Sequence, residues 1–210
     1  LGDVYKRQMR WCAGWVWGGW PTALGISGRG CCCTVQTICW CWRWDERMGY
    51  MTDFELMGLA LEEAAKAAAL GEVPVGAVVA RHGEVIATAH NTRETEKNAL
   101  HHAELLAIDA ACKKLGGWRL WECELFVTLE PCPMCAGAII NSRIRRVVYG
   151  AADTKAGCCG SVTDLFAMPF NHHPVVEQGL RAEEAQELLQ AFFKDLRARL
   201  AARPKWKPPV

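Results

Sequence analysis

The chain has 210 residues and a formal net charge of +1, and it is 51% hydrophobic and 22% charged. This composition is ordinary for a globular protein and excludes global disorder and collagen-like structure. A run of 18 or more apolar residues is absent from the sequence, which excludes a membrane-spanning helix. The small net charge excludes a global attraction to nucleic acid or to an anionic membrane, so any such binding must come from local patches.

Residues 1–50 differ in composition from the rest of the chain. They hold 6 of the 12 Cys and 7 of the 10 Trp and carry a net charge of +3, whereas residues 51–210 carry −2. They sustain no helical or strand periodicity and contain no clean signal peptide. A Cys-rich metal or disulfide module is one interpretation, but the Cys spacings match no common zinc pattern and the segment has no His. We therefore predict a non-native or disordered leader over 1–50 and a domain over 51–210.

Hydrophobic periodicity and turn residues predict nine elements in this domain. Thr52 and Glu55 have capping-box spacing, which predicts a helix start, and Gly71 is a typical helix stop. The expected elements are a helix over 52–70, strands over 74–79 and 85–89, a helix over 102–115, a strand over 124–129, a helix over 131–141, strands over 146–150 and 175–177, and a helix over 181–201. The core side of the last helix is expected to carry Leu188, Leu189, Phe192, Phe193 and Leu196. Helices alternating with strands predict an α/β fold, a three-layer α/β/α sandwich around a mixed five-stranded sheet.

Two short segments carry residues typical of a catalytic metal site. The sequence His102-Ala103-Glu104 opens the second predicted helix, and PCPMC over 131–135 opens the third. Cys132 and Cys135 are three residues apart, so one helical turn places both sulfurs on one face, and a helix N-terminus favours their thiolate form. Two thiolates and the His102 imidazole make three protein ligands, and catalytic zinc sites with three such ligands keep a fourth position for water.

Glu104 lies two residues from His102, so its side chain is expected beside the water, where it can carry protons. A lone Cys-x-x-Cys is weakly informative, because it also fits a redox pair or half of a structural zinc site. A lone His-x-Glu is weaker still. Together, His-x-Glu and Pro-Cys-x-x-Cys are the known signature of the zinc nucleobase deaminases. The pair of motifs, each opening a helix of one α/β domain, therefore favours a catalytic zinc site.

Residues from about 52 to 199 closely resemble the bacterial tRNA-specific adenosine deaminases. The matching stretches are EVPVGAV over 72–78, His102-Ala103-Glu104, VTLEPCPMCAGA over 127–138, Ser142-Arg143-Ile144, Asn171-His172 and Phe192-Phe193. The resemblance implies a cytidine-deaminase-like fold and a homodimer. It also implies hydrolytic deamination of adenosine to inosine at the wobble position (34) of a tRNA anticodon, with the anticodon loop as the bound partner.

The same resemblance implies a role for individual residues. One Zn²⁺ per subunit is expected on His102, Cys132 and Cys135, with Glu104 as the catalytic proton donor and acceptor. The remaining implied contacts are a hydrogen bond from Asn91 to the base and a loop containing Asp153 along the nucleotide path.

A few residues depart from the family pattern or compete with the assigned ones. Arg93 stands where the family often has Pro, and His101 adjoins His102, although the His-x-Glu spacing selects His102. Cys158 and Cys159 lie in a Gly-flanked loop, and because three ligands already complete the site we interpret them as inert thiols. His172 and His173 are either nucleotide contacts or ordinary surface-loop residues.

Two basic clusters are candidates for phosphate contacts. One comprises six basic residues between Lys194 and Lys207, which also fits a solvated helix end because cations favour helix C-termini. The other comprises Arg143, Arg145 and Arg146. With the family resemblance, they favour tRNA contact. A cytoplasmic location is expected, since ligand thiols must stay reduced and no export signal is clear.

Two other functions share parts of this pattern. A deaminase of a free nucleoside or base, such as cytidine, guanine or a pterin-like base, carries the same zinc signature. A structural zinc domain that binds RNA or protein is the non-enzymatic alternative. Glu104 argues against the latter, because a structural site fills four positions with protein ligands and needs no neighbouring carboxylate.

Overall fold

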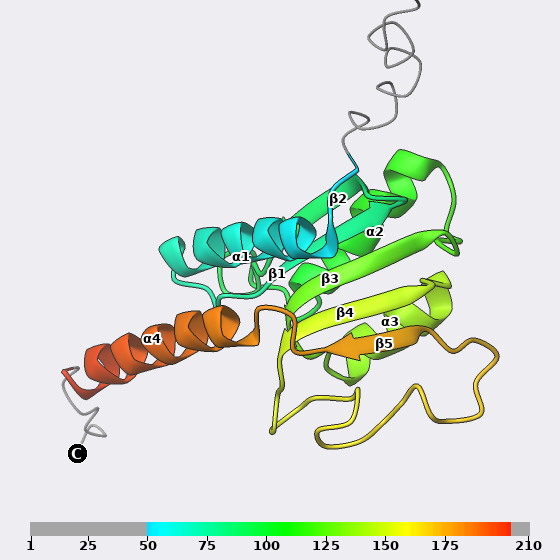
Figure 1. Ribbon diagram of the computed structural model, residues 1–210. Helices are drawn as coiled ribbons and strands as arrows, with labels where there is room; N and C mark the ends of the chain where they lie inside the picture. Colours follow the sequence, from blue (N-terminus) through cyan, green and yellow to red (C-terminus); the bar gives the residue numbers. More distant parts are fainter. Residues whose placement is uncertain (1–49, 203–210) are drawn as a thin grey trace, which may run out of the picture. The chain divides into compact units, whose positions relative to one another are not determined.

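The computed structural model describes residues 50–202 (Figure 1). The expectations for the leader and for the last basic residues, Arg203, Lys205 and Lys207, lie outside this range. The described part contains nine elements in the predicted order. They are α1 (Asp53–Ala69), β1 (Gly76–Arg81), β2 (Glu84–His90), α2 (Ala103–Leu115), β3 (Cys123–Leu129), α3 (Pro133–Ser142), β4 (Arg146–Ala151), β5 (Val175–Gln178) and α4 (Ala182–Ala201). Within the described residues, none of the helices is both long and apolar enough to cross a membrane.

The five strands form one mixed sheet in the order β2-β1-β3-β4-β5. Strand β1 pairs antiparallel with β2 and β3, whereas β3 pairs parallel with β4, and β4 with β5. Helices α1 and α4 cover one face, and α2 and α3 cover the other (Figure 1). This arrangement confirms the three-layer α/β/α sandwich.

The topology brings four chain segments to one end of the sheet. Because β1 runs antiparallel to β2 and β3, its first residues lie beside the last residues of both, as the pairs Gly76–His90 and Ala77–Val127 show. The parallel strand β4 ends beside β3 at the same edge. The segments before β1 and after β2, β3 and β4 therefore gather where ligands bind in open α/β sheets, outside the carboxyl ends of parallel strands.

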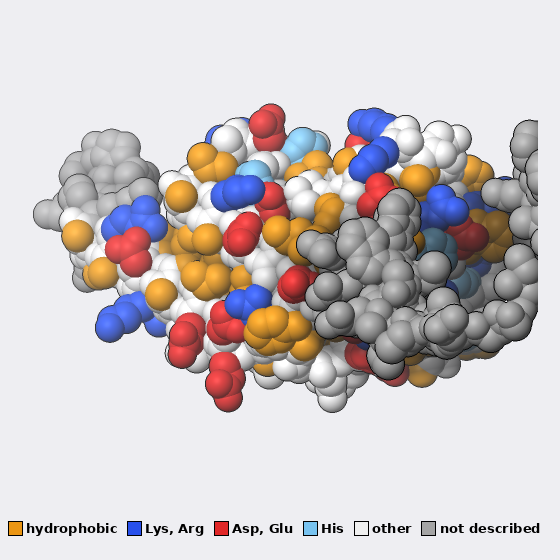
Figure 2. Space-filling model, turned by 45° about the horizontal axis from the view of Figure 1, so that its top comes forward, with side chains coloured by type: hydrophobic (Ala, Val, Ile, Leu, Met, Phe, Trp, Pro, Cys, Tyr) orange, Lys and Arg blue, Asp and Glu red, His pale blue; other side chains and the backbone are white. Residues whose placement is uncertain are grey.

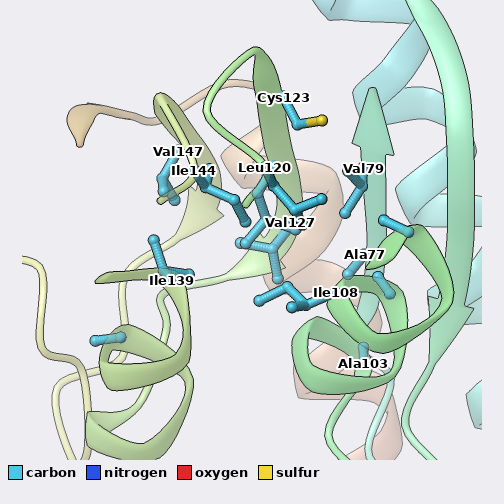
Figure 3. Close-up of a cluster of buried hydrophobic side chains, with 14 of the residues drawn as sticks. Ala77, Val79, Ala103, Ile108, Leu120, Cys123, Val127, Ile139, Ile144 and Val147 are labelled. Atoms are coloured by element: carbon cyan, nitrogen blue, oxygen red, sulfur yellow. The ribbon is translucent and has the colours of Figure 1, made fainter. Parts of the chain in front are cut away.

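The sheet is apolar on both faces because a helical layer covers each. On one side, Val79, Val127 and Val147 pack against α2 and α3, and Figure 3 shows Val127 and Val79 lying near Ile108 of α2. On the other side, Val78 and Phe126 pack against α1. Successive side chains of one strand pack into the hydrophobic clusters on opposite faces of the sheet, because side chains alternate with a period of two residues along a strand.

The sequence signals for helix ends are confirmed in detail. The Thr52 hydroxyl accepts a hydrogen bond from the Glu55 amide at 3.3 Å, and the Glu55 carboxylate accepts one from the Thr52 amide at 2.7 Å. Helix α1 ends at Ala69, and its C-cap residue Leu70 is followed by Gly71, whose φ of +80° suits glycine. Strand β1 begins two residues later than predicted, since Pro74 has no N–H to give to a ladder.

The last helix departs from its predicted burial. Phe192 is buried, but Phe193 is 40% exposed, and its ring meets that of Phe192 edge-on at 5.4 Å. Leu188, Leu189 and Leu196 are half-buried. The prediction that all five residues face the core was thus wrong for Phe193, because α4 lies at the edge of its layer and only one narrow stripe meets the sheet.

Gly76 is expected to tolerate no side chain. A Cβ there would collide with the Ala60 carbonyl oxygen and stand 2.6 Å from the Ala64 amide nitrogen, and both atoms are backbone. We expect Gly76→Ala to lower the free energy of unfolding by about 3 kcal/mol, measured by urea denaturation. The matched control is Gly137→Ala in α3, where a Cβ meets nothing within 4 Å, and the change is expected to stabilise by up to about 1 kcal/mol. Equal midpoints for Gly76→Ala and the parent would contradict this packing.

Candidate metal centre and substrate pocket

Two helix starts bring three metal-ligating side chains together. His102 is the N-cap residue of α2, Cys132 is the N-cap residue of α3, and Cys135 lies in the first turn of α3. His102 Nδ1 lies 3.6 Å from each sulfur, and the two sulfurs lie 3.6 Å apart. Within residues 50–202 this is the one cluster of His, Cys or acidic residues arranged to share an ion.

The spacing of these three atoms fits a tetrahedral ion. With Zn–S near 2.3 Å and Zn–N near 2.0–2.1 Å, two ligands of a tetrahedral zinc stand about 3.6–3.8 Å apart. All three observed separations fall in or at the edge of that range. The donors are two sulfurs and one imidazole nitrogen, a set that suits zinc. The residues present therefore fit the group that the sequence implies.

The electrostatics of the cluster favour a bound cation. The hydrogen bond with Cys135 is the largest cause that lowers the pKa of Cys132, to about 4, and the bond with His102 adds to it. The hydrogen bond with Cys132, followed by burial, raises the pKa of Cys135. Zinc binds cysteine as the thiolate, so an ion at this site must displace any proton that remains on Cys135, and its affinity is expected to rise with pH.

Glu104 lies beside the cluster as a buried carboxyl group with an unpartnered oxygen. Its side chain is 4% exposed, and burial raises its pKa. Its Oε2 is the one buried side-chain polar atom without a hydrogen-bond partner in the described part of the chain. An unsatisfied buried oxygen is costly, and such atoms call for a ligand or a function. Glu104 is therefore placed to exchange a proton with a molecule in the pocket.

A cavity of about 230 Å³ opens onto this group. His102, Glu104 and Cys132 line it together with Asn91 and Asp153, the two residues for which the family resemblance implies a substrate contact. Asn91 is 6% exposed, and Asp153 is half-buried. All six predicted site residues, Cys135 being the sixth, thus lie in or directly beside one pocket.

Two further pocket residues, Glu72 and Glu130, have no role in the sequence-based prediction. Both line the cavity, and both are buried. Burial works to raise their pKa values, but the hydrogen bonds they accept hold each pKa below its ordinary value. The signal in the sequence was an isolated carboxylate near the end of a buried strand, Glu72 four residues before β1 begins and Glu130 directly after β3.

The neighbouring Cys and His residues lie apart from the cluster. Cys158 is 2% exposed, and burial raises the pKa values of both Cys158 and Cys159, which keeps them as thiols. His101 Nδ1 lies 3.4 Å from the Thr92 hydroxyl oxygen. The rings of His172 and His173 hydrogen-bond backbone carbonyl oxygens, of Ile144 and Phe166 respectively.

The two basic clusters differ in how their charges are used. Arg146 pairs with Asp53 at 2.6 Å and Glu177 at 2.7 Å, and Arg145 pairs with Glu124. The charges of Arg145 and Arg146 are thus already paired, whereas Arg143 donates a hydrogen bond to the neutral Asn171 Oδ1 at 2.6 Å and forms no ion pair within the described residues. Exposed basic side chains do lie on α4, at Lys194, Arg197 and Arg199, of which Arg199 pairs with Asp195 at 2.8 Å. Figure 2 shows Lys and Arg side chains at the left end of the molecule, where α4 ends in Figure 1.

Residues 51–197 match the MafB19-like deaminase family. The fold, the two motif-bearing helix starts and this match make the chain a member of that deaminase family. It is 52% identical over 157 residues to the tRNA-specific adenosine deaminase of Bacillus subtilis, covering 74% of this chain and 98% of that protein. The chain therefore belongs to the tRNA-specific adenosine deaminases.

Solved structures agree with this assignment. One comes from work on A-to-I editing by tRNA:A34 deaminases at the wobble position of transfer RNA. It is 46% identical with a TM-score of 0.63, and covers 64% of this chain and 99% of that one. The guanine deaminase from Nitrosomonas europaea is 28% identical with a TM-score of 0.56, and covers 68% and 85%.

Proposed function

We propose that this protein hydrolyses the exocyclic amino group of adenosine at the wobble position (34) of a tRNA anticodon, giving inosine and ammonia. The observation that carries this proposal is the buried, unpartnered Glu104 oxygen beside the His102–Cys132–Cys135 cluster on the wall of one pocket. The 52% identity to a tRNA-specific adenosine deaminase supports the choice of substrate.

His102, Cys132 and Cys135 would hold one Zn²⁺ per subunit. When bound, zinc supplies a water molecule acidic enough to react near neutral pH. The three protein ligands leave one tetrahedral position for that water. A structural zinc site would use a fourth protein ligand, and no fourth His, Cys or acidic ligand joins the cluster among the described residues.

Glu104 carries the protons of the reaction. Its carboxylate takes one proton from the attacking water and passes it to the ring nitrogen next to C6 of adenine while the water oxygen bonds to C6. It then passes the second water proton to the amino group, which leaves as ammonia as the C6–N bond breaks. Its raised pKa suits this exchange, because a base that must also act as an acid works best near the operating pH.

The pocket walls hold the base for this transfer. Asn91 is proposed to hydrogen-bond the base and Asp153 to line the path of the nucleotide, since both residues line the cavity. A base in an anticodon loop is not paired within the tRNA, so it can be splayed into such a pocket at low cost. Lys194 and Arg197 of α4, which form no ion pair within the described residues, are the proposed phosphate contacts. A cytoplasmic homodimer completes the proposal, and sedimentation of the purified protein measures its mass.

Inosine sequencing tests the function directly. A tRNA pool incubated with the purified protein is expected to gain inosine at position 34, and pretreatment with a zinc chelator is expected to abolish it. Free adenosine, cytidine and guanine serve as competing substrates in parallel reactions. Turnover of free cytidine or guanine without inosine in tRNA would show that the protein deaminates a small molecule and would overturn the proposal.

A further inference from the structure

Two buried carboxylates in the pocket lining take no part in the chemistry above. Glu72 is fully buried before β1, and Glu130 is 2% exposed after β3. Neither forms an ion pair with Lys, Arg or His in the described residues. A buried carboxylate without a cationic partner is tolerated only when hydrogen bonds satisfy it. The donors that satisfy these two therefore show what each carboxylate organises.

Glu72 organises the segment that follows β2. Its Oε2 accepts from Asn91 Nδ2 at 3.3 Å and from the Glu94 amide at 3.1 Å. Its Oε1 accepts from the amide of Thr95 at 2.5 Å and from its hydroxyl at 2.7 Å. A carboxylate in this setting is an acceptor only, so the amide group that Asn91 turns toward it is the NH₂. The Asn91 amide is thus fixed in one orientation, with Oδ1 directed away from Glu72.

Glu130 organises the segment that follows β4 in the same way. Its Oε2 accepts from the Asp153 amide at 3.0 Å and from the Ser161 hydroxyl. Its Oε1 accepts from the amides of Cys159 at 2.9 Å and Ser161 at 3.1 Å. A Cβ at Gly157 would collide with this carboxylate, so the loop is shaped to wrap around it. The position of Asp153 in the pocket wall depends directly on Glu130.

Given the proposed function, we propose that Glu72 and Glu130 are positioning residues that aim the substrate contacts Asn91 and Asp153, respectively. Each of the two proposed substrate contacts is held by one carboxylate, which arises from a different strand end. Neither carboxylate needs to touch the substrate to act. The pair would set how firmly Asn91 and Asp153 hold the adenine in the pocket.

Glutamine is the sharpest probe of this role because it keeps the size of the side chain and replaces one acceptor oxygen by an NH₂ group. In Glu72→Gln, that NH₂ must face donors that now lack an acceptor, among them Asn91 Nδ2. In Glu130→Gln, the same conflict reaches the Asp153 amide. We expect each variant to lose about 10- to 100-fold in kcat/KM on an anticodon stem-loop. The loss is expected mainly as a higher KM, because weaker contacts to the substrate act on ground and transition states alike.

Double-mutant cycles test whether each carboxylate acts through its partner. Adding Glu72→Gln to Asn91→Ala, or Glu130→Gln to Asp153→Ala, is expected to lower kcat/KM little beyond the loss caused by the alanine change alone. The crossed pair combines Glu72→Gln with Asp153→Ala, which do not share a contact. Its fold-loss in kcat/KM is expected to equal the product of the two single fold-losses.

Glu63→Gln is the matched control for these variants. Glu63 is 8% exposed and accepts hydrogen bonds from Lys66, Thr88 and His90, but it lies outside the pocket lining. Its change is expected to alter kcat/KM by less than about threefold, as for sites without a shared partner.

Zinc content and urea unfolding are measured on every variant alongside the kinetics. Variants that keep full zinc and the parent midpoint, raise KM and show the partner-specific coupling support the positioning role. The positioning role is overturned if the losses in kcat/KM follow a loss of zinc or of folded protein. It is also overturned if the free-energy effects of Glu72→Gln and Asn91→Ala, and of Glu130→Gln and Asp153→Ala, are additive. If the parent protein itself makes no inosine, it is the proposed function that fails, so the two failures are distinguishable.

Discussion

Glu104→Gln is expected to abolish most turnover while leaving the protein folded and the metal site loaded. Proton transfer by a positioned side chain contributes about 10²–10⁴-fold to rate, so kcat on an anticodon stem-loop should fall by that factor. Glutamine fills the same buried space, but its amide can neither take a proton from water nor give one to the leaving amino group. Glu104→Ala should lose at least as much. Single-turnover kinetics of inosine formation measure the loss.

Metal analysis separates this role from metal binding. Glu104 lies outside the His102–Cys132–Cys135 cluster, so zinc per subunit is expected to stay near one in both variants. Glu62→Gln, an exposed carboxylate on α1, is the control and should retain full activity. If Glu104→Gln keeps the parent kcat, or loses zinc in proportion to its activity, the proton-transfer role is wrong.

The sequence predicted the fold closely because its strongest signals were local. The capping box at Thr52, the glycine stops and the apolar runs each specify one element without help from distant residues. Burial on α4 was less predictable, because which of two adjacent phenylalanines faces the sheet depends on how the helix docks at the edge of its layer. Phe193 was misplaced for that reason.

The metal cluster was predictable from spacing, but the pocket walls were not. Cys132 and Cys135 are neighbours on one helical turn, and the motif pairing brought in His102. Glu72 and Glu130 act through amides that lie 19–31 residues away along the chain. Such contacts exist only once β1, β2, β3 and β4 meet at one edge of the sheet, so periodicity carries no trace of them. Arg145 and Arg146 show the reverse case, because ion pairs with residues distant in sequence neutralise charges that are adjacent in the sequence.

Cys132→Ser is expected to empty the metal site and with it to remove activity. A serine hydroxyl is close in shape to the thiol but is not deprotonated near neutral pH, and zinc requires the deprotonated ligand. Cys132 is also the sulfur whose pKa is lowered, to about 4, mainly by its hydrogen bond with Cys135, so it is the preformed thiolate of the pair. We expect zinc affinity to fall by at least about 100-fold, as measured by competition with a chromogenic chelator.

Cys159→Ser is the matched control, because Cys159 is also half-buried but lies outside the cluster. It should bind one zinc per subunit with the parent affinity and make inosine at the parent rate, consistent with an inert thiol. Full zinc occupancy in Cys132→Ser would remove Cys132 from the ligand set, and zinc loss in Cys159→Ser would add Cys159 to it. If both variants bind zinc fully yet only Cys132→Ser is inactive, Cys132 must act on the substrate itself, because the two variants would then differ in activity but not in zinc content.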